Sequence, residues 1–179
     1  MQNKHCVRLL LHSIARGNLK PLIDGQSENE LTQEDIQLTT YAMATSLLDW
    51  TKILLKENLF YKDARVVALT SEGAHTFWES YAAVGIAKAS LESLATYMAV
   101  EFAPFSIRTN VIQAGITHTP SFDKIPGSKA LADFAEKRNP FGRTTKTQDV
   151  ADVVYLLCRD EAAWINGSLI HVDGGEHCK

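Results

Sequence analysis

Short, uninterrupted apolar runs alternate with longer segments of helical periodicity along this chain. Apolar runs at 7–12 (VRLLLH), 64–70, 107–113 and 168–172 predict strands buried on both faces, because their apolar residues follow one another without polar alternation. Between these runs, apolar residues spaced three and four apart predict helices at about 32–56, 81–102, 129–137 and 147–158. Thr32 is the expected N-cap of the first helix, with acidic residues in its first turn.

This alternation predicts an α/β fold: a Rossmann-like, doubly wound parallel sheet of about four strands, covered by helices on both faces. No repeat, low-complexity segment or linker interrupts the sequence, so we expect residues 1–179 to form a single domain. Ser13, Ser71 and Gly115 lie at the carboxyl ends of three predicted strands. Ligands of such sheets bind beyond these ends, so the three positions predict a shared site.

The composition and charge exclude several classes of function. A net charge of −3, with 45% hydrophobic and 22% charged residues, gives no electrostatic reason to expect nucleic acid or an acidic membrane as a partner. Cys6, Cys158 and Cys178 form no CxxC pair, which favours a reducing cytoplasm over a disulfide scaffold or a zinc site. No apolar run reaches bilayer length, and the histidines form no HExxH-like motif. We therefore expect a cytoplasmic protein without a metal.

The spacing of Tyr81 and Lys88 suggests a chemical site. Seven positions on a helix amount to two turns, about 20° from alignment and roughly 10 Å along the axis, so both side chains can face one cleft. An ammonium favours a nearby phenolate, which predicts that Lys88 lowers the pKa of Tyr81 from its usual ~10. Such a hydroxyl can protonate or stabilise an oxygen that gains negative charge. The alternative is a helix with one buried tyrosine and one surface lysine, and the spacing leaves both open.

With these residues in this order, nearly the whole chain resembles the short-chain dehydrogenase/reductase superfamily, and within it the enoyl-[acyl-carrier-protein] reductases. Tyr81-x6-Lys88 has the spacing of the enoyl reductases. The wider superfamily uses Tyr-x3-Lys, and the residue four before Lys88 is Val84, which has no acid chemistry. Further segments are similar to family motifs, namely 12–15 (HSIA), 114–119 (AGITHT) and 172–175 (VDGG).

The resemblance implies NADH or NADPH as cofactor and an enoyl thioester on acyl carrier protein as substrate. In that comparison Tyr81 hydrogen-bonds the thioester oxygen, Lys88 holds the nicotinamide ribose hydroxyls, and Ser71 donates a hydrogen bond near the same oxygen. The implied cofactor contacts are Ser13, Ile14, Ala15, Lys88, Gly115, Thr117 and Thr119. The implied substrate contacts are Tyr81, Phe122 and Ile125, the last two in a mobile segment over the acyl chain. The superfamily also implies a homotetramer or homodimer.

Two departures from the family pattern matter. Many enoyl reductases carry a second tyrosine where Ser71 stands, and a serine that only satisfies a strand-end backbone group is the alternative role. The glycines form neither GxGxxG nor the superfamily's GxxxGxG. The chain begins at the family's fourth strand, so roughly 60 residues, at about 30 per βαβ unit, would precede it in a complete member. We therefore expect the C-terminal part of a Rossmann-like domain, without the N-terminal glycine-rich half that holds the cofactor.

Two other functions stay open. The first is another reductase of the superfamily, acting on a ketone or a 3-oxoacyl thioester, which Val84 disfavours. The second is a truncated, inactive subunit with only an assembly role, which the missing phosphate-binding loop favours.

Overall fold

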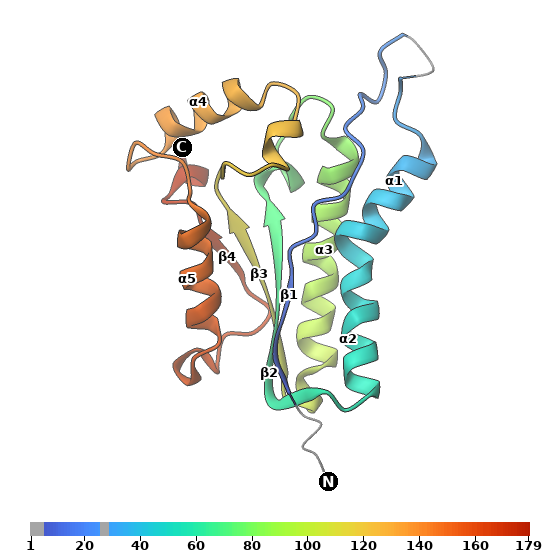
Figure 1. Cartoon of the computed structure of the whole chain (residues 1–179), viewed down its shortest axis with the longest axis vertical. Coiled ribbons are helices and arrows are strands. Elements are labelled where there is room, and N and C mark those ends of the chain that lie inside the picture. The colour runs from blue at the N-terminus through green and yellow to red at the C-terminus, as the bar shows by residue number, and fades with distance from the viewer. Residues whose placement is uncertain (1–5, 26–28) are drawn as a thin grey trace.

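The computed structural model describes residues 6–25 and 29–179, and within them four parallel strands form one sheet. The strands lie side by side in chain order: β1 (Val7–His12), β2 (Phe60–Ser71), β3 (Ile107–Ala114) and β4 (Leu169–Val172). The predicted α/β fold and its parallel sheet are confirmed. Because all strands run the same way, their carboxyl ends share one edge of the sheet (Figure 1).

Helices cover both faces of the sheet (Figure 1). On one face lie α1 (Gln33–Thr40), α2 (Ser46–Lys56) and α3 (Ala82–Glu101), and on the other lies α5 (Thr147–Leu157). A further helix, α4 (Ser128–Arg138), lies beyond the carboxyl ends of the strands. Among the described residues, no helix is both long and apolar enough to span a membrane.

Alternate residues of β2 point into two hydrophobic clusters. Val66 and Ala68 pack with Leu91 of α3 on one side of the sheet, and all three are fully buried. Val67, between them in sequence, packs against Leu157 of α5 on the other side. β2 is therefore buried on both faces, as its continuous apolar sequence predicts.

The first predicted helix is interrupted in the structure. Thr32 is its N-cap and forms a capping box, in which each of Thr32 and Asp35 accepts a backbone N–H of the other at 3.1 Å. Residues Tyr41–Thr45 then form a π-helical turn that separates α1 from α2. The sequence has no glycine or proline at this turn, so the continuous helix expected from 32 to 56 was wrong at this point.

The backbone after β2 comes unusually close to α3. Ser71 is followed by a short 3-10 turn, Glu72–Ala74. A Cβ atom added to Gly85 in α3 would lie 2.6 Å from the carbonyl oxygen of Gly73. The two segments can touch only because residue 85 has no side chain.

A Gly85→Ala substitution should therefore destabilise the protein. Replacing glycine by alanine normally stabilises a helix by about 1 kcal/mol. Overpacking against a rigid backbone, however, costs about 1–3 kcal/mol. We expect a net fall in the free energy of unfolding, measured by urea denaturation. The control is Ser93→Ala at an exposed position of the same helix, which should be neutral or slightly stabilising. A Gly85→Ala protein more stable than the wild type would contradict the close contact.

Candidate functional site

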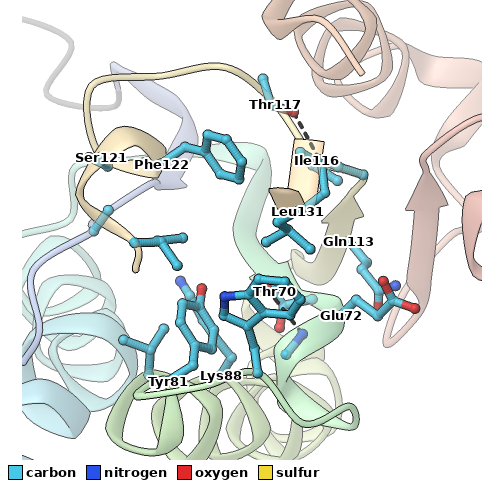
Figure 2. Close-up of a pocket in the computed structure, with 18 of the residues that line it drawn as sticks. Thr70, Glu72, Tyr81, Lys88, Gln113, Ile116, Thr117, Ser121, Phe122 and Leu131 are labelled. Carbon is cyan, nitrogen blue, oxygen red and sulfur yellow. Dashed lines mark hydrogen bonds between the residues drawn. The ribbon is translucent and has the colours of Figure 1, made fainter. Parts of the chain in front are cut away.

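A cavity of about 430 Å³ opens at the carboxyl edge of the sheet. Figure 2 shows Tyr81 and Lys88 on one side of it, with Phe122 and Leu131 facing them from the other. The structure brings all the predicted site residues to this cavity: Ser13, Ile14, Ala15, Ser71, Tyr81, Lys88, Gly115, Thr117, Thr119, Phe122 and Ile125. Their individual roles remain predictions.

Tyr81 is held at the start of α3 rather than within it. It is the N-cap residue, and Ser80 before it has a φ of 58°, in the left-handed region that non-glycine residues rarely adopt. The Tyr81 ring lies against Gly73, where a Cβ atom would be only 2.5 Å from Tyr81 Cε1. The position of the phenol therefore depends on a glycine at residue 73.

The expectation that Lys88 lowers the pKa of Tyr81 is wrong. Burial raises the pKa of Tyr81, and the neighbouring Ser71 side chain offsets only part of that rise. Lys88 does not act on the phenol because its ammonium lies at the strand end, where Nζ donates to the Leu69 carbonyl at 2.7 Å. Tyr81 is thus a protonated hydrogen-bond donor at neutral pH.

Lys88 itself is 6% exposed. Burial lowers its pKa to about 8, although Glu92 one turn further along α3 opposes the shift. Of the three donors of the ammonium, the bond to Leu69 uses one.

His12, at the end of β1, is a buried neutral base beside this lysine. Its Nε2 lies 2.9 Å from Ser46 Oγ, and that hydroxyl donates to the Ala42 carbonyl at 3.0 Å. Since the hydroxyl proton is used, Nε2 carries the imidazole proton and Nδ1 is a bare acceptor, without a partner among the described residues. Burial, together with the Lys88 charge, lowers the pKa of His12 to about 4.

The hydroxyl groups of the site make local hydrogen bonds. Ser71 Oγ accepts the Gly73 N–H at 3.2 Å, which is the structural role expected as the alternative for this serine. This bond uses one lone pair of the Ser71 oxygen. The Ser71 O–H can still donate to another acceptor. Thr117 Oγ1 donates to the Gly115 carbonyl at 2.9 Å, and Thr119 Oγ1 accepts the Phe122 N–H at 3.1 Å. Both threonines therefore shape the loop after β3.

An ionic cluster in the cavity wall was missed from the sequence. Arg138, the last residue of α4, bonds Glu72 through Nη1 and Oε1 at 2.9 Å and Glu176 through Nη2 and Oε1, also at 2.9 Å. These carboxylates raise the pKa of the arginine further above its usual value, since they stabilise its charge. Glu176 is 1% exposed, and its Oε2 has no partner among the described residues. The three residues come from separate segments and form no sequence motif, so only the tertiary structure brings them together.

A tryptophan joins two loops that border the cavity. Trp78 Nε1 donates to the Pro126 carbonyl at 3.2 Å and so ties the segment before Tyr81 to the segment that carries Phe122. No group of three or more His, Cys, Asp or Glu side chains in the described residues could hold a metal ion. The cavity thus combines a phenol, a buried ammonium and an apolar wall.

A parallel α/β sheet with a tyrosine and a lysine at its carboxyl edge is the architecture of the short-chain dehydrogenase/reductases. The family model described as enoyl-(acyl carrier protein) reductase matches residues 4–177. The chain belongs to that family.

Known members of the family are similar along most of the chain. The NADH-dependent enoyl-[acyl-carrier-protein] reductase FabI of Aquifex aeolicus is 32% identical over 176 residues, which are 98% of this chain and 64% of that protein. The NADPH-dependent FabI of Staphylococcus aureus is 32% identical over 170 residues, covering 93% and 63%. The crystal structure of the Aquifex aeolicus enzyme superposes with a TM-score of 0.87 at 31% identity, covering 97% of this chain and 66% of that one. The chain therefore spans about 64% of the length of the Aquifex aeolicus relative.

Replacing Arg138 should destabilise the fold. Arg138→Met leaves the buried carboxylate of Glu176 without its counter-ion, and breaking such a pair costs about 3 kcal/mol. Denaturant unfolding measures the loss. As a control, Arg143→Met removes the more exposed Arg143–Asp149 pair and should cost less than about 1 kcal/mol. Removing the second charge, in Arg138→Met/Glu176→Met, should recover part of the loss. A single Arg138→Met variant as stable as the control would contradict this account.

The His12 pKa predicts how stability depends on pH. The folded protein keeps His12 neutral down to about pH 4, whereas the unfolded chain protonates it below about 6.5. The unfolded state therefore binds more protons in this window, and stability falls as pH decreases from 6.5 towards 4, by up to about 1.4 kcal/mol per pH unit. In His12→Gln this contribution should disappear. The free energy of unfolding is measured by denaturation at several pH values. If it changes with pH equally in wild type and variant, the assigned role of His12 is refuted.

Proposed function

We propose that this chain carries the catalytic cavity of an enoyl-[acyl-carrier-protein] reductase, which reduces the C2–C3 double bond of an enoyl thioester with NADH or NADPH in fatty-acid synthesis. The observation that carries the proposal is the pairing of a partly buried, protonated Tyr81 with a buried Lys88 at one cavity. The FabI relatives, which are named for this reaction, support it.

The residues around Lys88 suit the nicotinamide-ribose end of such a cofactor. Two of the ammonium donors remain beyond the bond to Leu69 and can serve a pair of vicinal hydroxyls. Ser13, Ile14 and Ala15, in the segment after β1, line the same cavity as Lys88. No glycine-rich loop leads into a helix within the described residues, so we assign no contact to the pyrophosphate. When bound, the cofactor would supply a hydride to C3 of the substrate.

Tyr81 would act on the substrate, at its thioester oxygen. Reduction at C3 places negative charge on the thioester oxygen as an enolate. Because its pKa is raised, Tyr81 is protonated at neutral pH and can donate a hydrogen bond to that oxygen. A hydrogen bond aimed at developing charge stabilises the transition state more than the ground state. Ser71 would donate nearby.

The apolar wall fits an acyl chain. Phe122 is 7% exposed, and Ile125 and Leu131 line the cavity beside it. These side chains would exclude water from the reacting atoms, and the segment from Pro120 to Ser128 would cover the substrate. We further propose that the protein acts in the cytoplasm as a homodimer or homotetramer; exposed apolar residues on α3, Tyr97 and Val100, support self-association.

The test is oxidation of NADH or NADPH by the purified protein with crotonyl and acetoacetyl thioesters of acyl carrier protein. We expect turnover of the crotonyl thioester, and a Tyr81→Phe variant should lose at least about 100-fold in kcat. Tyr155→Phe, on an exposed part of α5, is the matched control and should keep its rate.

The outcomes separate the competing functions. Turnover of the acetoacetyl thioester alone would favour a ketone-reducing member of the superfamily. Absence of turnover with either thioester and either cofactor would favour an assembly role. Full activity of Tyr81→Phe would remove Tyr81 from the mechanism.

A further inference from the structure

Beyond β4, three side chains lie in a row that starts at the cavity lining and ends at the surface of the protein. Asp173 Oδ2 is 2.6 Å from His177 Nδ1, and His177 Nε2 is 3.4 Å from Cys178 Sγ. Asp173 is 4% exposed and also lines the cavity, whereas the Cys178 thiol faces solvent. A thiol, a base and a carboxylate in this order form the arrangement that activates nucleophiles in proteins.

The carboxylate determines where the imidazole proton lies. Burial alone would raise the pKa of Asp173, but hydrogen bonds from the His177 amide and ring and from the Gly175 amide lower it overall. The ionised carboxylate accepts the proton at Nδ1 of His177. In the neutral imidazole Nε2 therefore carries the lone pair, and this atom faces the sulfur.

The ring of His177 is also fixed in orientation. His171 of β4 stacks on it, with ring centroids 3.8 Å apart and planes 15° from parallel. The titratable and charged groups around the imidazole are thus Asp173, His171, Cys178 and, next in sequence, Lys179. Glu176 is adjacent in sequence but bonds Arg138.

We propose that Cys178 is a modification site, a nucleophilic thiol that reacts with small, soft alkylating carbon electrophiles. In alkylation the sulfur forms a bond to carbon, the carbon–leaving-group bond breaks, and the leaving group departs with the electron pair. The thiol proton passes to Nε2 of His177 and then to solvent. This chemistry does not depend on the reductase function.

The chain supplies its own controls. Cys6 is an exposed thiol, and Cys158 is partly buried close enough to Arg8 to interact with its charge. Within the described part of the chain, neither thiol makes a hydrogen bond to an imidazole. Cys6 therefore shows the effect of exposure alone, and Cys158 shows the effect of a neighbouring cation. Both can be compared with the Asp173–His177–Cys178 arrangement in the same molecule.

The experiment is the rate of iodoacetamide labelling at each cysteine at pH 6.5, read by peptide mass spectrometry. An ordinary thiol has a pKa of about 8.5 and is almost entirely protonated there. We expect Cys178 to react at least about tenfold faster than Cys6, because the adjacent imidazole can accept the thiol proton as the sulfur attacks. His177→Asn should reduce the Cys178 rate to that of Cys6, and the matched His75→Asn should not change it.

His177 directly precedes Cys178 in the sequence, so it could affect the thiol even in the unfolded chain. Labelling in denaturant therefore separates the effect of the folded arrangement from that of the local sequence. In guanidinium chloride the advantage of Cys178 over Cys6 should disappear. Three results would overturn the proposal: equal rates for Cys178 and Cys6 in the folded protein, an unchanged Cys178 rate in a folded His177→Asn variant, or an advantage that persists in denaturant.

Discussion

The backbone at Gly73 lies between the ring of Tyr81 and the Gly85 position of α3, and the geometry of the site depends on this contact. A Cβ atom at Gly73 would come within 2.5 Å of the Tyr81 ring, and one at Gly85 would come within 2.6 Å of the Gly73 carbonyl. The two glycines therefore set the distance between the end of β2 and the start of α3. That distance determines where the phenol sits relative to the strand end that holds Lys88.

Burial controls the charges around the cavity. It keeps Tyr81 protonated, lowers the pKa of Lys88 to about 8 and keeps His12 neutral. A protonated phenol is suited to donate to an oxygen that gains negative charge, and a cation at the strand end is suited to hold hydroxyl groups. The Arg138 cluster adds a second, structural set of charges that joins α4 to the ends of β2 and β4.

The sequence predicts the elements well where local signals are strong. Continuous apolar runs locate all four strands of the described sheet, and the Thr32 cap locates the start of α1. The family resemblance also points to residues that line the cavity. The π-helical turn, the Arg138 cluster and the pKa of Tyr81 could not be predicted, because each depends on contacts between distant segments. The error over Tyr81 has the same cause: helical spacing suggested that Lys88 lay near the phenol, whereas its ammonium reaches a strand carbonyl instead.

The proposed role of Lys88 is to hold the nicotinamide-ribose end of a cofactor at the carboxyl edge of the sheet. Equilibrium binding of reduced nicotinamide mononucleotide and of NADH tests it most directly, by fluorescence titration at pH 7 and pH 9.5. Wild-type affinity should fall at the higher pH, because Lys88 loses its charge above about 8. Lys88→Met should bind at least about tenfold more weakly at pH 7, whereas Lys62→Met, exposed near the other end of β2, should bind normally. Equal affinity of wild type and Lys88→Met at both pH values, or no binding by any form, would contradict the account.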